Sequence, residues 1–129
     1  MPLDEAWALL SVHAHPAADP DALVAGLDAL AAGCRVPTLD GLRHHLFVDQ
    51  GFVGNQDDYY DPANTYLDDV LERHLGIPIT LAVLTMEVGR RIGVPVDGIG
   101  LPGHFVLRDR VDPTVFVDAF RGGEVLDRD

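Results

Sequence analysis

Lysine is absent from this sequence of 129 residues, and all nine of its basic residues are arginine. Twenty-one aspartate and glutamate residues outweigh them and give a formal net charge of -12 at pH 7. A surface with this excess of negative charge repels nucleic-acid backbones and anionic membranes. We therefore expect neither nucleic acid nor a membrane as a general partner.

Cysteine and long apolar runs are scarce as well. Cys34 is the single cysteine, so an internal disulfide framework is excluded. No apolar run approaches the roughly 20 residues that a membrane-spanning helix needs, and no secretion signal opens the sequence. These absences predict a cytoplasmic protein. The length predicts one domain over residues 1–129, built around a single core.

The first part of that domain, residues 1–50, is expected to be helical. Apolar residues recur at helical spacing in residues 3–12, and again between Pro20 and Gly33, which are typical of a helix start and a helix end. Thr38 is placed to cap a third helix.

Residues 51–129 are expected to form the core. The turn-rich residues 51–64 hold four apolar or aromatic side chains, so we expect this loop to pack against the domain. Residues 61–75 predict one helix with an apolar face. A second helix begins at Pro78 and is apolar all the way around, which predicts burial on most sides.

Beyond Gly93 the pattern changes to short segments rich in Val, Ile and Phe. Residues 94–100, 103–109 and 114–120 predict strands. Their connections are too short for crossover helices, so the sheet is expected to be antiparallel. Helices followed by strands predict an α+β fold, with the central buried helix packed on a small antiparallel sheet.

His104 and Asp118 are the first candidates for chemistry. His104 lies at the start of a predicted strand and Asp118 at the end of the next one, and neighbouring antiparallel strands would bring the two side chains within hydrogen-bond reach. A carboxylate that orients an imidazole makes it a general base. The alternative is a structural pair that ties two strands together, and spacing alone favours this alternative.

A nucleophile to accompany this pair is hard to find. Cys34 follows a predicted helix end, where the helix dipole disfavours a thiolate, so an incidental thiol is the better interpretation. Thr80 lies in the first turn of the buried helix, where a structural threonine is the better interpretation.

Histidines also raise the possibility of a metal site. His13 and His15, and the adjacent His44 and His45, are the densest groups. Neither spacing puts two ligands on one face of a helix, and no cysteine cluster accompanies them. We therefore expect no metal and no other cofactor.

Three sequence blocks, YYDPANTYL, GIPITL and LPGHF, occur in this order over roughly residues 46–126. Together they resemble the SirB-one family, a mostly bacterial branch of the transglutaminase-like superfamily. The resemblance implies a papain-like core, in which a central helix begins at the nucleophilic cysteine and an antiparallel sheet supplies histidine and then aspartate. Laid on this sequence without gaps, that pattern puts its cysteine on Pro78, its histidine on His104 and its aspartate on Asp118.

The resemblance thus implies a triad that keeps its acid-base pair and lacks its nucleophile. We expect a non-catalytic module that uses the vestigial cleft for binding or regulation, with a peptide or protein as ligand. Two alternatives stay open: a cysteine-independent hydrolase in which His104 activates water, and a purely structural module. The residues of the three blocks that are expected to contact a ligand are Tyr60, Asn64, Thr80 and Gly103. Members of the family often carry a tetratricopeptide-like region after this core, so the chain is expected to be a short member or a fragment.

Overall fold

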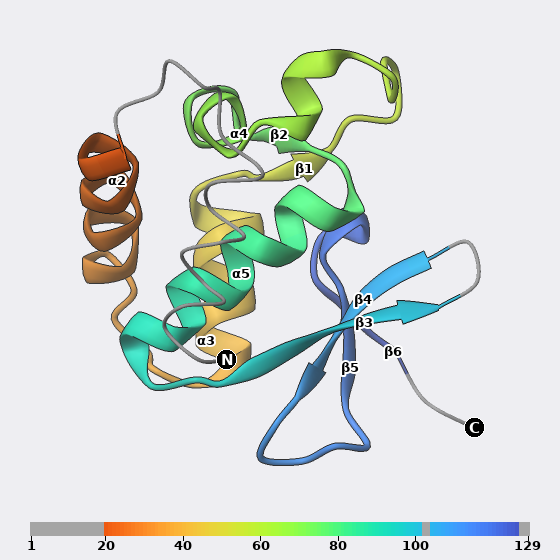
Figure 1. Ribbon diagram of the computed structural model, residues 1–129. Helices are drawn as coiled ribbons and strands as arrows, with labels where there is room; N and C mark the ends of the chain where they lie inside the picture. Colours follow the sequence, from red (N-terminus) through yellow and green to blue (C-terminus); the bar gives the residue numbers. More distant parts are fainter. Residues whose placement is uncertain (1–19, 102–103, 127–129) are drawn as a thin grey trace.

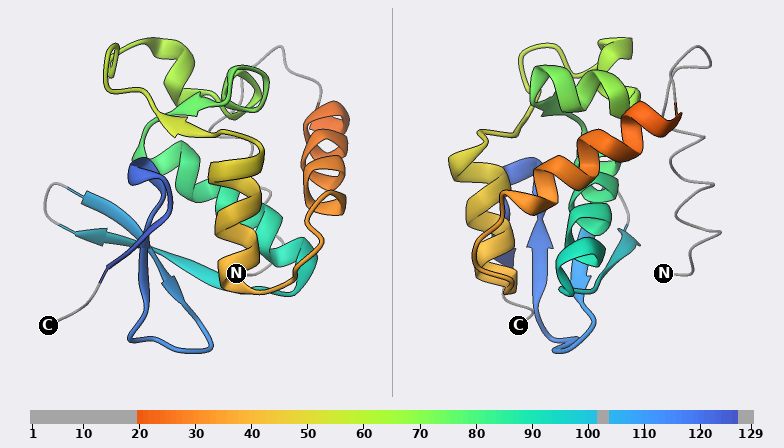
Figure 2. Two further views of the ribbon diagram at one scale, coloured as in Figure 1. Left: turned by 180° about the vertical axis from the view of Figure 1, so that it is seen from behind. Right: turned by 90° about the vertical axis from the view of Figure 1, so that its left-hand side faces the viewer.

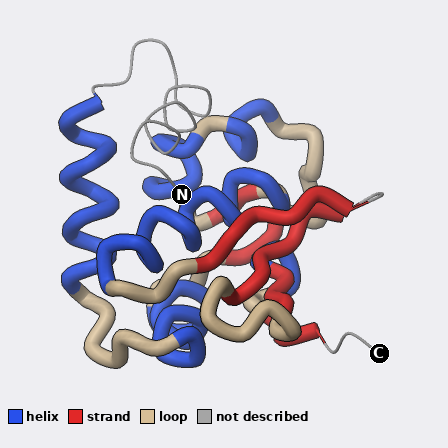
Figure 3. Tube along the Cα trace, turned by 60° about the horizontal axis from the view of Figure 1, so that its bottom comes forward, coloured by secondary structure: helices blue, strands red, loops and turns tan. Residues whose placement is uncertain are grey.

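The computed structural model describes residues 20–101 and 104–126. Within this part of the chain, the longer helices gather on one side of the molecule and a four-stranded sheet on the other (Figures 1 and 3). The predicted α+β class is confirmed. The helix predicted in residues 3–12 lies outside the described residues.

Helix α5, Pro78–Ile92, runs through the middle of the fold, between α2 on one side and the sheet on the other (Figure 1). It begins at Pro78 and ends at Gly93, as predicted, and Gly93 adopts the left-handed conformation with φ 78°. Every residue from Thr80 to Gly89 is buried. A helix surrounded in this way has no polar face, which explains its sequence.

The helices predicted between Pro20 and Gly33 and after Thr38 both lie against α5. Helix α2, Pro20–Ala32, crosses it, and α3, Leu39–His44, packs beside it and continues into a wide π-type turn, His45–Asp49 (Figure 2). The hydroxyl of Thr38 accepts a hydrogen bond from the backbone N–H of Gly41 at 3.0 Å. The predicted cap of α3 is therefore confirmed.

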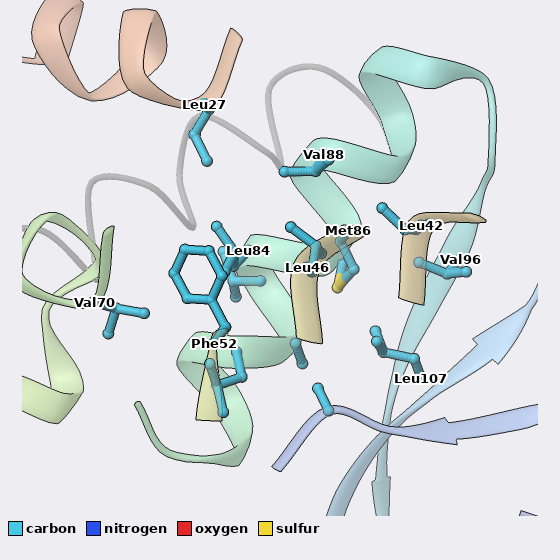
Figure 4. Close-up of a cluster of buried hydrophobic side chains, with 14 of the residues drawn as sticks. Leu27, Leu42, Leu46, Phe52, Val70, Leu84, Met86, Val88, Val96 and Leu107 are labelled. Atoms are coloured by element: carbon cyan, nitrogen blue, oxygen red, sulfur yellow. The ribbon is translucent and has the colours of Figure 1, made fainter. Parts of the chain in front are cut away.

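The hydrophobic core collects one apolar face from each of these elements (Figure 4). Side chains that are no more than 1% exposed come from α2, α3, α5, the sheet, helix α4 (Leu67–Arg73) and the loop at Phe52. They include Leu27, Leu42, Phe52, Val70, Leu84 and Leu107. Among the described residues, no helix has the length and apolarity that a membrane crossing requires.

The sheet contains strands β3, Val96–Leu101, β4, His104–Asp109, β5, Phe116–Asp118, and β6, Glu124–Leu126. They follow one another in the sheet in sequence order, and each pair is antiparallel. The three predicted strands and their antiparallel pairing are confirmed. Strand β6 was not predicted, because its three residues are too few to show an alternating pattern.

The prediction of one helix over residues 61–75 is wrong. A 3₁₀ turn, Pro62–Thr65, precedes the shorter helix α4, Leu67–Arg73. Strand β2, Leu75–Gly76, follows and pairs in parallel with β1, Val53–Gly54.

Two local features explain this division. His74 adopts the left-handed conformation with φ 61°, which ends α4 at that residue. The chain then pairs with β1, since the N–H of Val53 donates to the carbonyl of His74 at 3.0 Å and that of Asn55 to Gly76 at 2.9 Å. A Cβ on Gly76 would lie 2.9 Å from the Thr80 hydroxyl oxygen, so glycine allows β2 to approach the start of α5.

Candidate functional site

A cleft of about 790 Å³ lies where the start of α5 meets the loop after β1 and the end of β5. Its walls bring together apolar and aromatic side chains and the polar side chains of Gln56, Asp118 and Arg121, and ligand-binding clefts combine both kinds of surface. The lining residues are Val53, Gly54, Gln56, Tyr59, Pro78, Phe105, Asp118, Phe120, Arg121 and Gly122.

Pro78 lines this cleft as the first residue of α5. Proline is well suited to the first helical position, because its φ is already helical and the missing N–H would have no partner within the helix. The same side chain carries no atom that can act as a nucleophile or as a proton donor. The start of the central helix therefore contributes shape to the cleft and no reactive group.

Asp118 lines the same cleft from the end of β5, and only 8% of its surface is exposed. Its Oδ1 accepts a hydrogen bond from the N–H of Phe120 at 3.0 Å, and its Oδ2 lies 3.8 Å from Nε of Arg121. The carboxylate is thus held in place by the short 3₁₀ turn Ala119–Arg121 that it caps.

The backbone of His104 begins β4, where it pairs with Leu101 of β3. Strand β4 also pairs with β5, with Leu107 opposite Val117, so His104 and Asp118 belong to neighbouring antiparallel strands as predicted. The side chain of His104 and the whole of Gly103 lie outside the described residues. The hydrogen bond between His104 and Asp118 stays a prediction.

Thr80 was expected to contact a ligand, but the structure places it away from the surface, with no exposed area. Its hydroxyl accepts a hydrogen bond from the N–H of Ile77 at 3.1 Å and donates to the carbonyl of Asn64 at 2.8 Å. These bonds fix the chain that enters α5 and tie it to the 3₁₀ turn before α4. The role visible in the structure is to hold the helix start in position.

Asn64 was also expected to contact a ligand and is likewise fully buried. Its amide nitrogen donates to the carbonyls of Asp58 and Tyr59 at 2.8 and 2.9 Å, and its amide oxygen accepts from the side chain of Asn55 at 3.0 Å. The oxygen of Asn55 in turn accepts from the N–H of Asp58 at 3.0 Å. The two asparagines together form an internal support for the loop, and contact between Asn64 and a ligand stays a prediction.

The loop itself packs only in part, which corrects a second expectation. Phe52 is buried and stacks on His74 with ring centroids 4.1 Å apart. Tyr59 reaches the cleft and meets Phe120 edge to face. Tyr60, in contrast, is 91% exposed. Tyr60, which was expected to contact a ligand, does not line the cleft, whereas its neighbour Tyr59 does.

Several cleft residues were not predicted from the sequence. Phe105 follows His104, and Phe120 and Arg121 follow Asp118, so nearness to those two residues was an available signal. Gln56 carried no such signal. Gly54 allows the cleft walls to meet, since a Cβ there would lie 2.5 Å from the carbonyl oxygen of Phe120.

The remaining candidates lie elsewhere. Cys34 does not line the cleft, and its thiol donates weakly to the carbonyl of Val36. His44 is exposed and pairs with Asp49 at 3.3 Å, whereas His45 is buried with Nε2 2.7 Å from the carbonyl oxygen of Leu30. In residues 20–101 and 104–126, no group of three or more His, Cys, Asp or Glu side chains is arranged to hold a metal ion. His13 and His15 lie outside the described residues.

Comparison with known proteins gives one family. A family model described as the transglutaminase-like superfamily matches residues 10–129, which is nearly the whole chain. No solved structure matches the chain significantly.

Similar proteins include bacterial and animal sequences. The chain is 52% identical over 87 residues to a UPF0162 protein of Xylella fastidiosa, an alignment that covers 67% of this chain and 31% of the relative. It is 38% identical over 62 residues to a UPF0162 protein of Vibrio cholerae, which covers 48% of this chain and 23% of the relative. F-box only protein 21 of Mus musculus is 37% identical over 98 residues, which covers 68% of this chain and 16% of that protein. The chain thus spans about a third or less of the length of these relatives.

Proposed function

The chain belongs to the transglutaminase-like superfamily, and from this membership we propose that it is a non-catalytic domain of the SirB-one type, which uses a vestigial active-site cleft as a binding or regulatory module. One observation carries the proposal: Pro78 and Asp118 line the same cleft, and Pro78 begins the central helix where an active member would place its cysteine. A site without a nucleophile at this position has no route to the covalent acyl-enzyme of cysteine chemistry.

The ligand proposed for this cleft is a peptide or protein segment. The apolar surfaces of Val53, Phe105 and Phe120 offer contact area, and Gln56 and Arg121 offer polar groups. Polar groups of this kind fix the orientation of a ligand, and burial against the apolar surfaces adds to its affinity.

A panning experiment tests the proposal. The purified protein is exposed to a phage library of random decapeptides, and the bound peptides are sequenced and then tested as synthetic peptides. We expect the protein to retain a set of peptides without cleaving them, as followed by mass spectrometry. The variant Gln56→Trp places a bulky side chain in the cleft and should lose them, whereas Val111→Ala, at an exposed site in the β4–β5 turn, should not. A library that yields no bound peptide overturns the proposal.

A second candidate function is a hydrolase that needs no cysteine. The observation in its favour is that Asp118 lines the cleft and that its carboxylate is held by the N–H of Phe120. In this proposal the carboxylate orients His104, which acts as a general base for water. Screening the purified protein against amide and ester substrates distinguishes the two. Hydrolysis that is present in the wild type and absent in His104→Ala would replace the binding proposal with this one.

A purely structural role is the third candidate, and the cap that Asp118 provides to the turn Ala119–Arg121 favours it. In this case Asp118→Asn should destabilise the protein, and neither binding nor hydrolysis should be detected. We further propose that the 129 residues act as one domain in the cytoplasm, which limited proteolysis and cell fractionation would test.

A further inference from the structure

Three aromatic rings form a continuous row from the cleft to the surface. Phe120 lines the cleft, Tyr59 meets it edge to face at a centroid distance of 5.7 Å, and Tyr60 meets Tyr59 edge to face at 5.2 Å. The exposure of the two tyrosines rises along the row, from 41% for Tyr59 to 91% for Tyr60. We name these three residues the aromatic row. A ring as exposed as that of Tyr60 has most of its surface free to contact a ligand, and aromatic side chains contribute large contact areas at interfaces.

The backbone beneath Tyr60 is nevertheless fixed. The buried Asn64 donates to the carbonyls of Asp58 and Tyr59, and the buried Asn55 accepts from the N–H of Asp58. The N–H of Asp61 closes the turn by donating to the carbonyl of Asp58 at 3.2 Å. A turn that is ordered before binding loses little conformational entropy when a ligand arrives. The turn that carries Tyr59 and Tyr60 is therefore ordered before a ligand binds.

The charge around Tyr60 is negative. Asp57 and Asp58 belong to the same turn and are exposed, and neither carboxylate forms an ion pair with another described residue. Asp61 differs, since it pairs with Arg73 at 3.2 Å. Across the cleft, the charge of Arg121 is offset by Asp118 at 3.8 Å. The exposed end of the aromatic row thus combines ring faces with two uncompensated carboxylates, a combination that attracts cations.

We propose that the aromatic row docks a polypeptide segment in which an arginine or lysine adjoins a bulky apolar residue. The cationic side chain lies on the face of Tyr60, close to the carboxylates of Asp57 and Asp58. The apolar side chain enters the cleft and packs on Phe120. This inference rests on the proposed function, because it names the class of peptide that the cleft would bind.

The same peptide library tests the inference. We expect the retained decapeptides to be enriched in arginine or lysine next to leucine, isoleucine or phenylalanine. In a synthetic peptide of that set, exchange of arginine for the neutral isostere citrulline should weaken binding about three- to tenfold, as measured by fluorescence polarisation. The exchange should have a smaller effect on the variant Tyr60→Ala, which lacks the ring but keeps the carboxylates of Asp57 and Asp58. Tyr60→Phe keeps the ring and should keep the preference, and the exposed-site control Val111→Ala should match the wild type.

The outcomes separate this inference from the proposed function. If the retained peptides fail to bind Gln56→Trp but show no enrichment in basic residues, the docking role of the aromatic row is overturned and the cleft remains a binding site. A preference for arginine that is as large in Tyr60→Ala as in the wild type would do the same. Failure of the library to yield any peptide would overturn both. Weaker salt dependence in the double variant Asp57→Asn, Asp58→Asn would support the assigned role of the two carboxylates.

Discussion

Pro78 and Asp118 line one cleft from two different elements, the start of the central helix and the end of a strand. The carboxylate is held by the turn that follows it, with Phe120 N–H donating to Oδ1 at 3.0 Å. Proline at the helix start offers a good first residue and no reactive atom. The start of the central helix therefore gives this cleft shape and no reactive group, and the strand end gives it a fixed carboxylate.

The first prediction concerns the hydrogen bonds that place the helix start. Thr80→Val keeps the shape of the side chain but leaves the N–H of Ile77 and the carbonyl of Asn64 without their partner. We expect the free energy of unfolding to fall by about 1–3 kcal/mol, measured by denaturation with guanidinium chloride. Thr85→Val is the matched control, since Thr85 is equally buried but donates only to the carbonyl of Leu81 within the same helix. An equal loss in both variants would contradict the bridging role of Thr80.

A second prediction tests the central position of α5. Leu84 has no exposed area and contributes to the core in the middle of this helix (Figure 4). Leu84→Ala should lower the free energy of unfolding by about 2–5 kcal/mol, because it removes buried apolar contacts and leaves a cavity. Val111→Ala, at an 80% exposed site, should change it by less than about 0.5 kcal/mol. A Leu84→Ala variant as stable as this control would mean that α5 is not the centre of the core.

The support beneath the cleft loop gives a third prediction. Asn64→Asp keeps the acceptor for Asn55 but removes the NH₂ group that donates to the carbonyls of Asp58 and Tyr59. Backbone amides in residues 55–61 should then exchange with solvent faster, which hydrogen–deuterium exchange with mass spectrometry measures. Thr65→Ala removes only an exposed hydroxyl bond to the carbonyl of Pro62 and should leave this exchange unchanged. Unchanged exchange in Asn64→Asp would show that the loop is ordered by something else.

The dependence of stability on pH gives a fourth prediction. The hydrogen bond from the Arg110 guanidinium lowers the pKa of Asp97 below its ordinary value of 3.8. A carboxylate whose folded-state pKa is depressed stabilises the protein above its unfolded pKa and loses that contribution as the pH falls through the folded value. Asp97→Asn should therefore lower the free energy of unfolding at pH 7, by less than about 1 kcal/mol since the pair is near the surface. The difference from the wild type should shrink in urea titrations below pH 3.8. A difference that is constant with pH would contradict the assignment.

The sequence predicted those helices and strands correctly whose ends or caps are determined by residues close together in the chain. Pro78 and Gly93 bound the central helix as expected, and Thr38 caps α3, because each effect depends on residues close in the chain. Strand β2 escaped prediction because its two residues pair with β1 across more than twenty positions. Such pairings are set by tertiary contacts, which local periodicity does not record.

In the candidate site, too, the sequence identified some residues and missed what depends on tertiary contacts. The sequence was sufficient to single out Pro78 and Asp118, which share the cleft, because the family pattern carries them. It did not show that Asn64 and Thr80 are buried supports, since burial of a polar side chain depends on partners brought together by folding. The exposed position of Tyr60 was missed for a related reason: a tyrosine in a turn gives no indication of which side it faces.

The reactivity of a cysteine introduced by Pro78→Cys tests most directly whether the cleft is a vestigial active site. The variant is made in a Cys34→Ser background, so that the only thiol is at the start of α5. Its rate of alkylation by iodoacetamide is followed against pH, with the same variant carrying His104→Ala for comparison. A preserved site predicts an inflection well below the ordinary thiol pKa of about 8.5, and a return towards that value when His104 is removed. A thiol that is unreactive in the folded protein, or one that titrates near its ordinary pKa with and without His104, would contradict the assignment of this cleft.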